Sequence, residues 1–386
     1  MNMHKTQEQF GFPVGYLNFH KEQIFNFQLN RWYSLGYARY EDFTDVATRI
    51  QDFDDWKAEL IKLAQRAEQE NRLLNAAYYY RAAEFYISPD NPDKIKTYEK
   101  FKSLIHPLLA DDGIEILNAP YESGYLPCLK MNAVRNARKG TIVIHGGFDS
   151  FKEEFYSIMK YFSGSGYDVI IFEGPGQGDA RKTYNLVLDY KWEKPVSAVL
   201  DHFGLKDVTL LGISLGGYLC FRAAAFEPRI KKVIASSVAY DYTDFPPKLL
   251  QPIIRLFYNR LTNYTNNATL RAMKKGGLKS WYFSNLIYMT GSERPIDAIR
   301  YLTRMTAEAL HCDRITQDVL ILTGRDDHLI PLKMHKKQVG ALVNAKSVTE
   351  RVFCKDSHAS NHCQIGNMPL NLQAMTEWID KIDEVE

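Results

Sequence analysis

A serine enclosed by glycines is the feature that most constrains the fold of this 386-residue chain. It lies in the motif GISLG at 212–216. The preceding residues, VTLL, have the pattern of a buried strand, and the following YLCFRAAAF has the pattern of an apolar helix. On so tight a strand-to-helix turn the hydroxyl stands above the sheet, and glycine avoids collisions between neighbouring backbones. The helix N-terminus adds free N–H groups. We therefore predict that Ser214 is a nucleophile.

From about Gly113 onward, short apolar runs alternate with helical patterns. The predicted strands are 113–118, 126–132, 140–145, 169–172, 208–212, 232–236, 319–323 and 347–353. The predicted helices between them are 153–163, 192–202, 215–226 and 333–343. Strands that alternate with helices in this way favour an α/β fold, a mostly parallel, doubly wound sheet covered by helices on both faces.

Two regions lack this alternation. Residues 1–110 have helical periodicity from Asp45 to Tyr98, interrupted by the SPDNPD turn, which predicts an N-terminal helical domain. Residues 241–312 are aromatic and helical, without a strand pattern. A long insertion in a sheet fold is typical of a functional lid, so we predict a helical cap there. The α/β core then comprises 111–240 and 313–386.

A serine nucleophile needs a base and an acid to orient that base. In folds with such a serine the histidine comes last in the chain. His358 and His362 both follow the last predicted strand, and we prefer His362 while keeping His358 as an alternative. Asp326 and Asp327 both follow the strand before it. We prefer Asp327, which stands four residues before a proline, and keep Asp326 as an alternative.

Acyl transfer also requires N–H donors for the developing oxyanion. One predicted donor is the N–H of Leu215, directly after the serine. The other is expected in the HGGFDS loop that follows the third predicted strand, where glycines let backbone N–H groups face the site. Gly147 and Phe148 are both candidates for it.

Three polar residues near these loops are candidate substrate contacts. Asp149 follows the predicted oxyanion donors, where it would bind a substrate donor, act as a second acid, or cap the helix that starts near residue 151. Glu173 and Gln177 belong to the run EGPGQG at the end of the fourth predicted strand. This run lacks the spacing of a nucleotide-binding loop, so we interpret it as a tight turn at the rim of the site.

Charge and cysteine usage argue against several classes of protein function. With 48 basic and 46 acidic residues the net charge is +2, which does not predict binding to nucleic acid or to a membrane. Neither a membrane span nor a secretory leader is recognisable. The five cysteines lack metal-site spacing, so we expect no metal and a reduced, cytoplasmic protein. No organic cofactor is indicated. The expected partner is a small-molecule substrate, and a homodimer through the helical domain stays open.

The blocks HGGFDSFKEE, FEGPGQG, GISLGGY, TGRDDHLIP and NHCQIGN together resemble the α/β-hydrolase superfamily. They are similar to a branch that contains 2,6-dihydroxypseudooxynicotine hydrolase, fungal polyketide-shortening hydrolases, and FrsA-like and acylaminoacyl-peptidase-like proteins. The resemblance implies an N-terminal helical domain and a triad of Ser214, Asp327 and His362. Where Asp149 stands, branch members that cleave carbon–carbon bonds have an acidic residue, usually glutamate.

We therefore expect a serine hydrolase that cleaves an ester, thioester or amide of a small to medium acyl compound through an acyl-enzyme. One alternative is carbon–carbon cleavage of a ketone or β-diketone, with Asp149 or Glu173 as the proton donor. Another is a peptidase for short acylated peptides, which a carboxylate-binding arginine in the cap would favour. The candidate arginines are Arg255, Arg260, Arg271 and Arg300. A binding protein on a hydrolase scaffold is least favoured, because the triad is complete.

Overall fold

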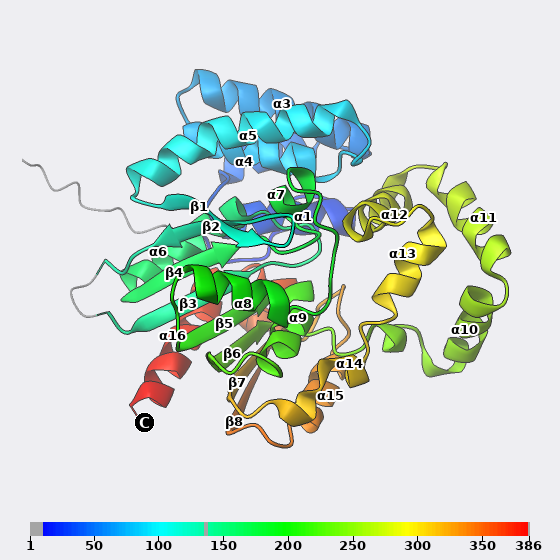
Figure 1. Cartoon of the computed structure of the whole chain (residues 1–386). Coiled ribbons are helices and arrows are strands. Elements are labelled where there is room, and N and C mark those ends of the chain that lie inside the picture. Colours follow the sequence, from blue (N-terminus) through cyan, green and yellow to red (C-terminus); the bar gives the residue numbers. More distant parts are fainter. Residues whose placement is uncertain (1–10, 135–137, 385–386) are drawn as a thin grey trace, which may run out of the picture.

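The computed structural model describes residues 11–134 and 138–384. Residues 1–10 lie outside the described residues. The start of the predicted helical domain and the expectation about a secretory leader both fall on them. An eight-stranded sheet of order β1-β2-β4-β3-β5-β6-β7-β8 forms the centre of the molecule (Figure 1). The strands are β1 (Glu115–Tyr121), β2 (Gly124–Met131), β3 (Gly140–His145), β4 (Tyr167–Phe172), β5 (Val208–Ile213), β6 (Ile230–Ser236), β7 (Asp318–Gly324) and β8 (Ser347–Phe353).

All eight predicted strands are present, and the α/β prediction is confirmed. Strands β3 to β8 run parallel, while β1 and β2 pair antiparallel with each other and β2 pairs antiparallel with β4. The central strands are apolar on both faces because both faces are covered. In β3, for example, Ile142 and Ile144 pack in one core and Val143 packs in the other.

Helices from the core region cover the two faces. The 3₁₀ turn Lys152–Phe155, α6 (Tyr156–Gly164) and the C-terminal α16 (Met368–Asp383) pack on one side, and α8 (Glu193–His202), α9 (Leu215–Ala224) and α15 (Lys333–Ala341) pack on the other. The short α7 (Gly178–Lys182) was not predicted. Helix α9 begins directly after Ser214, as the sequence indicated.

Five helices precede the sheet, and the described residues 11–110 contain no strand. They are α1 (Gln23–Ser34), α2 (Tyr40–Ala47), α3 (Phe53–Gln69), α4 (Leu73–Phe85) and α5 (Pro92–Asp111). Within the helical periodicity expected from Asp45, a new helix, α3, begins at Phe53, because the carboxylate of Asp52 accepts hydrogen bonds from the N–H groups of Asp54 and Asp55. That these helices form a separate domain stays a prediction.

The insertion between β6 and β7 is helical, with no strand. Its helices are α10 (Gln251–Asn259), α11 (Thr262–Met273), α12 (Gly277–Thr290), α13 (Pro295–Leu302) and α14 (Ala307–Leu310). In Figure 1, α10 and α11 stand away from the sheet, whereas α12 lies next to α1. The indole N–H of Trp281 in α12 donates to the carbonyl of Phe85 in α4 at 2.7 Å, so the insertion is joined to the N-terminal helices. None of the described helices is long and apolar enough to cross a membrane.

Candidate active site

The turn between β5 and α9 holds Ser214 in a strained conformation, with φ 64° and ψ −121°. Its N–H donates to the carbonyl of Ser236 at 2.9 Å. Two glycines let the backbone pass through this turn. A Cβ on Gly212 would lie 2.0 Å from the carbonyl oxygen of Gly216, and a Cβ on Gly216 would lie 2.7 Å from that of Gly146. Glycine is therefore required at both positions of the motif, because a Cβ there would collide with neighbouring backbone.

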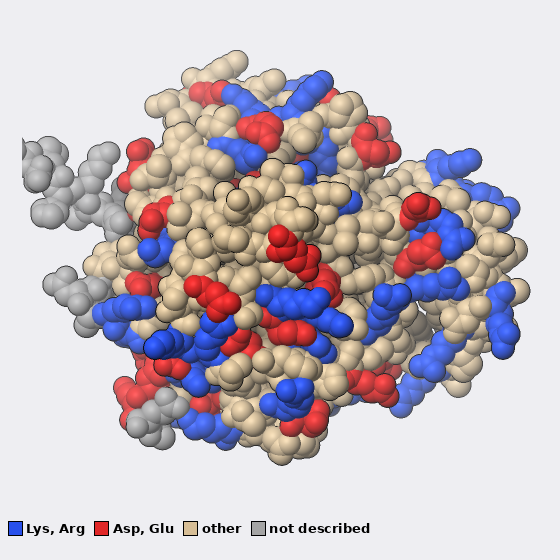
Figure 2. Space-filling view, viewed as in Figure 1, with Lys and Arg blue, Asp and Glu red and all other residues tan. Residues whose placement is uncertain are grey.

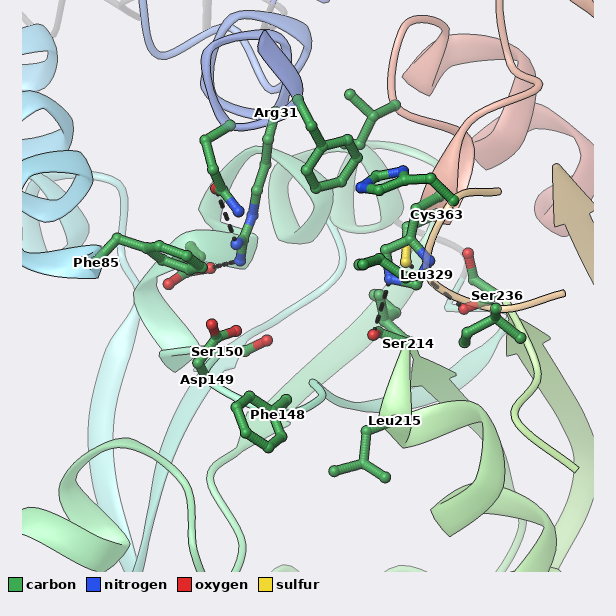
Figure 3. Close-up of a pocket in the computed structure, with 18 of the residues that line it drawn as sticks. Arg31, Phe85, Phe148, Asp149, Ser150, Ser214, Leu215, Ser236, Leu329 and Cys363 are labelled. Carbon is green, nitrogen blue, oxygen red and sulfur yellow. Dashed lines mark hydrogen bonds and ion pairs between the residues drawn. The ribbon is translucent and has the colours of Figure 1, made fainter. Parts of the chain in front are cut away.

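The structure brings the three predicted triad residues together. The Nε2 atom of His362 lies 2.9 Å from Ser214 Oγ, and its Nδ1 atom lies 2.7 Å from Asp327 Oδ2. Figure 3 shows Ser214 at the wall of the cavity. His362 follows β8 and is 4% exposed, and Asp327 follows the end of β7. The alternatives His358 and Asp326 are both exposed, and neither side chain has a hydrogen bond in the described part of the chain. The geometry thus favours His362 and Asp327 over them.

Hydrogen bonds hold the carboxylate of Asp327 in its ionised form. Its Oδ1 accepts from the N–H groups of Leu329 and Ile330, each at 2.9 Å, and its Oδ2 accepts from Ser237 Oγ at 3.0 Å. Burial acts to raise the pKa of Asp327, but the charge of His362 and these hydrogen bonds outweigh it and lower the pKa.

The same ion pair acts in the opposite direction on the imidazole. Burial acts to lower the pKa of His362, but the carboxylate of Asp327 outweighs it and raises the pKa well above its usual value. With a proton on Nδ1 facing Asp327, the lone pair of Nε2 faces Ser214 Oγ. This arrangement is the one required for His362 to remove the serine proton.

The structure distinguishes the two candidate loop donors. The N–H of Gly147 donates to Ser150 Oγ at 3.2 Å and is therefore occupied. The N–H groups of Phe148 and Leu215 have no hydrogen bond to other described residues. A Cβ on Gly147 would lie 3.0 Å from Leu215 N, so this loop lies directly against the start of α9. Phe148 and Leu215 are thus the donors left for an oxyanion, and Gly147 provides the close approach.

The structure does not place Glu173 and Gln177 on the cavity wall, so it gives no support to their prediction as substrate contacts. Glu173 is 2% exposed and accepts hydrogen bonds from the N–H groups of Lys152 and Asp179. Gln177 is equally buried, and its Nε2 donates to the carbonyls of both Gly146 and Gly147 at 2.9 Å. Their polar groups bind the protein itself, and Gln177 holds the loop that presents Phe148.

A cavity of about 660 Å³ opens above Ser214, and most of its wall is apolar or aromatic. Segments far apart in the chain line it, among them Phe27 of α1, Trp281 and Tyr282 of α12, and Met375 of α16. The ring of Tyr282 stacks on that of Phe148 with centroids 5.5 Å apart. The insertion and the N-terminal helices thus both enclose the site.

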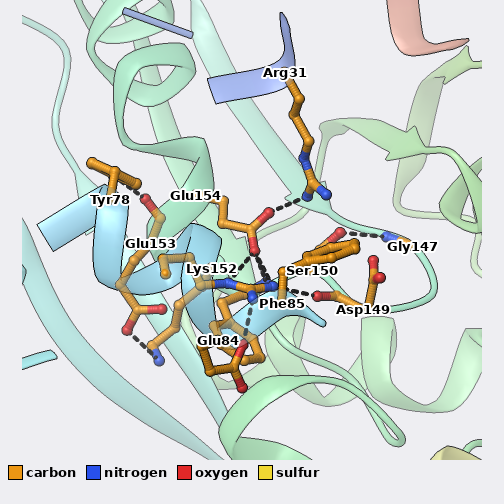
Figure 4. Close-up of polar contacts among 12 residues, drawn as sticks. Arg31, Tyr78, Glu84, Phe85, Gly147, Asp149, Ser150, Lys152, Glu153 and Glu154 are labelled. Atoms are coloured by element: carbon orange, nitrogen blue, oxygen red, sulfur yellow. Dashed lines mark hydrogen bonds and ion pairs between the residues drawn. The ribbon is translucent and has the colours of Figure 1, made fainter. Parts of the chain in front are cut away.

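One side of this cavity is polar (Figures 3 and 4). Arg31 of α1 forms an ion pair with the buried carboxylate of Glu154, which Arg81 also binds. Asp149 lines the cavity, and its carboxylate has no hydrogen-bond partner among the described residues. Burial raises the pKa of Asp149. Because the N-cap of the following 3₁₀ turn is Phe151, the capping role considered for Asp149 is not observed.

Sequence reasoning missed Arg31 and His328. Arg31 belongs to a helix whose signal was weak, although a charged side chain within an aromatic run such as IFNFQLNRWY is a usable signal. His328 lines the cavity with its ring 4.7 Å from that of Phe27. Burial and the charge of His362 lower the pKa of His328. The four cap arginines considered as carboxylate ligands do not line the cavity.

Comparisons with known proteins agree with this architecture. Residues 142–362 match the family described as alpha/beta hydrolase fold. Alpha/beta hydrolase psoB of Aspergillus fumigatus is 26% identical over 94% of this chain and 93% of its own, and hydrolase LUC6 of Fusarium sp is 25% identical over 93% and 96%. The 20-hydroxy-prefusarin hydrolase FUS2 of Gibberella moniliformis is 28% identical over 66% of each chain.

Two solved structures share the fold over nearly the whole chain. AbyA5 superposes with a TM-score of 0.65 at 17% identity, covering 90% of this chain and 95% of its own. The 2,6-dihydroxy-pseudo-oxynicotine hydrolase superposes with a TM-score of 0.61 at 20% identity, covering 91% and 94%. The resemblance to this hydrolase branch is confirmed, and the relatives support an enzyme of the hydrolase class.

Proposed function

This chain belongs to the α/β-hydrolase fold family, and we propose that it is a serine hydrolase in which Ser214 is the nucleophile, His362 the base and Asp327 the orienting acid. The observation that carries the proposal is the continuous hydrogen-bonded chain through the three side chains, at 2.9 Å and 2.7 Å. The strained serine and the two unoccupied N–H groups beside it add independent support.

In the proposed reaction His362 removes the proton of Ser214 Oγ as the oxygen attacks a substrate carbonyl carbon. The carbonyl oxygen gains negative charge, which the N–H groups of Phe148 and Leu215 stabilise. The protonated His362 then gives its proton to the leaving group, and an acyl-enzyme remains. His362 next removes a proton from water, which attacks the acyl carbonyl and releases an acid and the free serine.

The cavity supports a small to medium acyl compound as the substrate. Its volume of about 660 Å³ falls in the range of small-molecule sites, and its wall is mainly aromatic and aliphatic. An ester, a thioester or an amide would each present the carbonyl that this mechanism requires.

Carbon–carbon bond hydrolysis is the second candidate, and Asp149 is the observation that favours it. A carbanion leaving group needs a proton, and burial raises the pKa of the Asp149 carboxyl, which favours the protonated form that could donate one. Asp149 lines the same cavity as Ser214. Glu173, the other proton donor considered, is buried outside the cavity wall and supports no such role.

Hydrolysis of p-nitrophenyl esters from acetyl to decanoyl, beside an aryl β-diketone and an acyl-peptide anilide, tests these proposals. Ser214→Ala should lower kcat for every substrate by on the order of a millionfold. A fluorophosphonate probe should label wild type at Ser214 and leave Ser214→Ala unlabelled. Ser165→Ala, which changes a serine on the opposite end of the sheet, is the matched control. Equal turnover by wild type and Ser214→Ala on all substrates would refute the proposal.

Asp149→Asn separates the two candidate reactions. If Asp149 supplies a proton to a carbanion, the variant should lose diketone cleavage and keep cleavage of a simple ester, because an ester leaving group takes its proton from His362. If no diketone is cleaved by wild type, the carbon–carbon reaction is excluded for that substrate and the ester reaction stands alone.

A further inference from the structure

The first two cap helices and their flanks carry an uncompensated positive charge. Between residues 245 and 292 the sequence has seven basic side chains and no aspartate or glutamate. They are Lys248, Arg255, Arg260, Arg271, Lys274, Lys275 and Lys279. The chain as a whole has 48 basic and 46 acidic residues, so everything outside this segment is acidic on balance. The near-neutral total conceals this local charge.

These basic side chains are exposed, and none forms an ion pair with a described carboxylate. Elsewhere many exposed cations are paired, for example Arg49 with Asp45 and Glu59. At the base of the cap, Lys333 and Lys337 share the carboxylate of Asp244. Figure 2 shows blue groups spread over the lobe formed by α10 and α11. The positive charge there is thus available to an external anion.

Large apolar side chains lie exposed among these cations. In α10, Ile253 and Leu256 lie three positions apart and therefore on the same side of the helix. Leu249 belongs to the preceding 3₁₀ turn Lys248–Leu250, and Arg260 follows α10 directly. Leu249, Ile253 and Leu256 are 89%, 51% and 51% exposed. Helix α10 buries none of its residues against the described chain.

Helix α11 also exposes apolar and basic side chains. Tyr264 and Leu270 are 61% and 39% exposed, Arg271 lies on the same helix, and Lys274 and Lys275 follow its end at Met273. Two neighbouring helices therefore present apolar side chains interleaved with basic ones, and the lobe that they form extends away from the sheet (Figure 1).

An apolar groove lies beside this surface. Its volume is about 710 Å³, and Phe257 and Tyr264 are among the residues that line it. Trp281, Tyr282 and Leu329 line both the groove and the cavity above Ser214. The cationic and apolar surface thus borders a groove that shares wall residues with the cavity above Ser214.

We propose that the cap surface, defined as the exposed side chains of residues 248–279, binds the anionic face of a lipid bilayer. Basic helices with interleaved leucine, isoleucine and tyrosine lie in the plane of such an interface, where cations meet headgroups and apolar side chains enter the acyl region. An acidic protein surface would pair with the basic side chains, but it would not provide an apolar environment for Leu249, Ile253 and Leu256. The observations therefore favour lipid.

Vesicle flotation of the full chain tests this proposal. We expect binding to vesicles of 70% phosphatidylcholine and 30% phosphatidylglycerol, little binding to pure phosphatidylcholine, and loss of binding as salt screens the charge. Lys248→Glu/Lys274→Glu/Lys275→Glu should weaken binding by about tenfold or more. The control Lys206→Glu/Lys336→Glu/Lys355→Glu makes the same charge change at exposed, unpaired lysines outside the cap. It should bind like wild type.

A second pair of variants tests the apolar part. Ile253→Ser/Leu256→Ser should weaken binding to the same vesicles by about tenfold, whereas Ile95→Ser/Val343→Ser, at positions elsewhere that are at least as exposed, should not. Hydrolysis of a water-soluble acetyl ester should stay within about twofold of wild type in all four variants, because none changes the catalytic machinery.

Three outcomes would overturn the proposal. Wild type fails to float with the anionic vesicles, the control lysine variant loses binding as much as the cap variant, or the cap variants abolish a concentration-dependent self-association seen without lipid. The last outcome would assign the surface to contact between copies of this chain.

Discussion

The two sides of the cavity differ in how their polar atoms are satisfied. On the catalytic side, both nitrogens of His362 and both carboxylate oxygens of Asp327 have partners within the protein. On the side formed by Arg31 and Asp149, the carboxylate of Asp149 faces the cavity without one (Figure 3). Asp149 is half-buried, so a ligand that donates a hydrogen bond to its carboxylate would gain affinity there. The side chains proposed for the reaction are thus already hydrogen-bonded within the protein, whereas the carboxylate of Asp149 is left for a ligand to bind.

The largest effect on activity should come from a substitution among the hydrogen-bonded side chains next to Ser214. Asp327→Asn removes the charge that fixes the tautomer of His362 and should lower kcat for ester hydrolysis by about ten-thousandfold. Asp326→Asn, one residue away on an exposed side chain, should stay within about twofold of wild type. Equal losses in the two variants would contradict the assignment of Asp327.

A smaller loss should follow from filling the gap beside the oxyanion donors. In Gly147→Ala the new Cβ would lie 2.9 Å from Ser214 Cβ and 3.0 Å from Leu215 N. One of the segments has to move, and losing one oxyanion donor lowers kcat by about a hundredfold or more. Gly340→Ala, where a Cβ meets nothing within 4 Å, is the control. Steady-state kinetics and a melting curve separate a local effect from unfolding.

On the side of the cavity formed by Arg31 and Asp149, the effect of a substitution should depend on the substrate. Asp149→Asn weakens acceptance of a hydrogen-bond donor and should raise KM by about tenfold for esters that carry a hydroxyl or an N–H group near the acyl chain. A plain aliphatic ester should be unaffected, as should every substrate with the exposed-site control Asp356→Asn. A uniform loss on all esters would show that Asp149 acts on the reaction itself.

The pH dependence of the reaction should report the raised pKa of His362. Because Asp327 raises the pKa of His362, the imidazole is protonated and inactive at low pH. We expect kcat/KM to rise with pH through a value above the ordinary histidine pKa of about 6.5. In Asp327→Asn the cause of the raised pKa is absent, so NMR titration of His362 should place it lower. An unchanged pKa would contradict the ion pair.

The strands, and the meeting of Ser214, Asp327 and His362, could be predicted because their signals are local. The apolar runs around β3, β5 and β7 are strands whatever surrounds them, and the order of Ser214, Asp327 and His362 follows from loops at the ends of strands. Helix α1 was missed because it buries Asn26, Gln28 and Asn30 among its aromatics, which obscures the amphipathic pattern. The amide of Asn30, for example, binds the backbone of Leu17.

Other features depend on contacts that no local pattern reports. The side chains of Glu173 and Gln177 turn toward the protein, although the run of glycines around them looks the same for a loop that faces a ligand. The choice between Gly147 and Phe148 required the hydrogen bond from Gly147 to Ser150. The charge of the cap, by contrast, was present in the sequence and was concealed by counting over the whole chain.

The way α1 and α12 close the cavity has a consequence for how such proteins diverge. The triad side chains form no hydrogen bond with either helix, yet Phe27, Arg31 and Trp281 line the space that a ligand would occupy. Substitutions on these two helices can therefore change which molecule is accepted while the reaction stays the same. A lineage with this architecture can acquire new substrates by mutating segments that lie far from its catalytic motifs in the sequence.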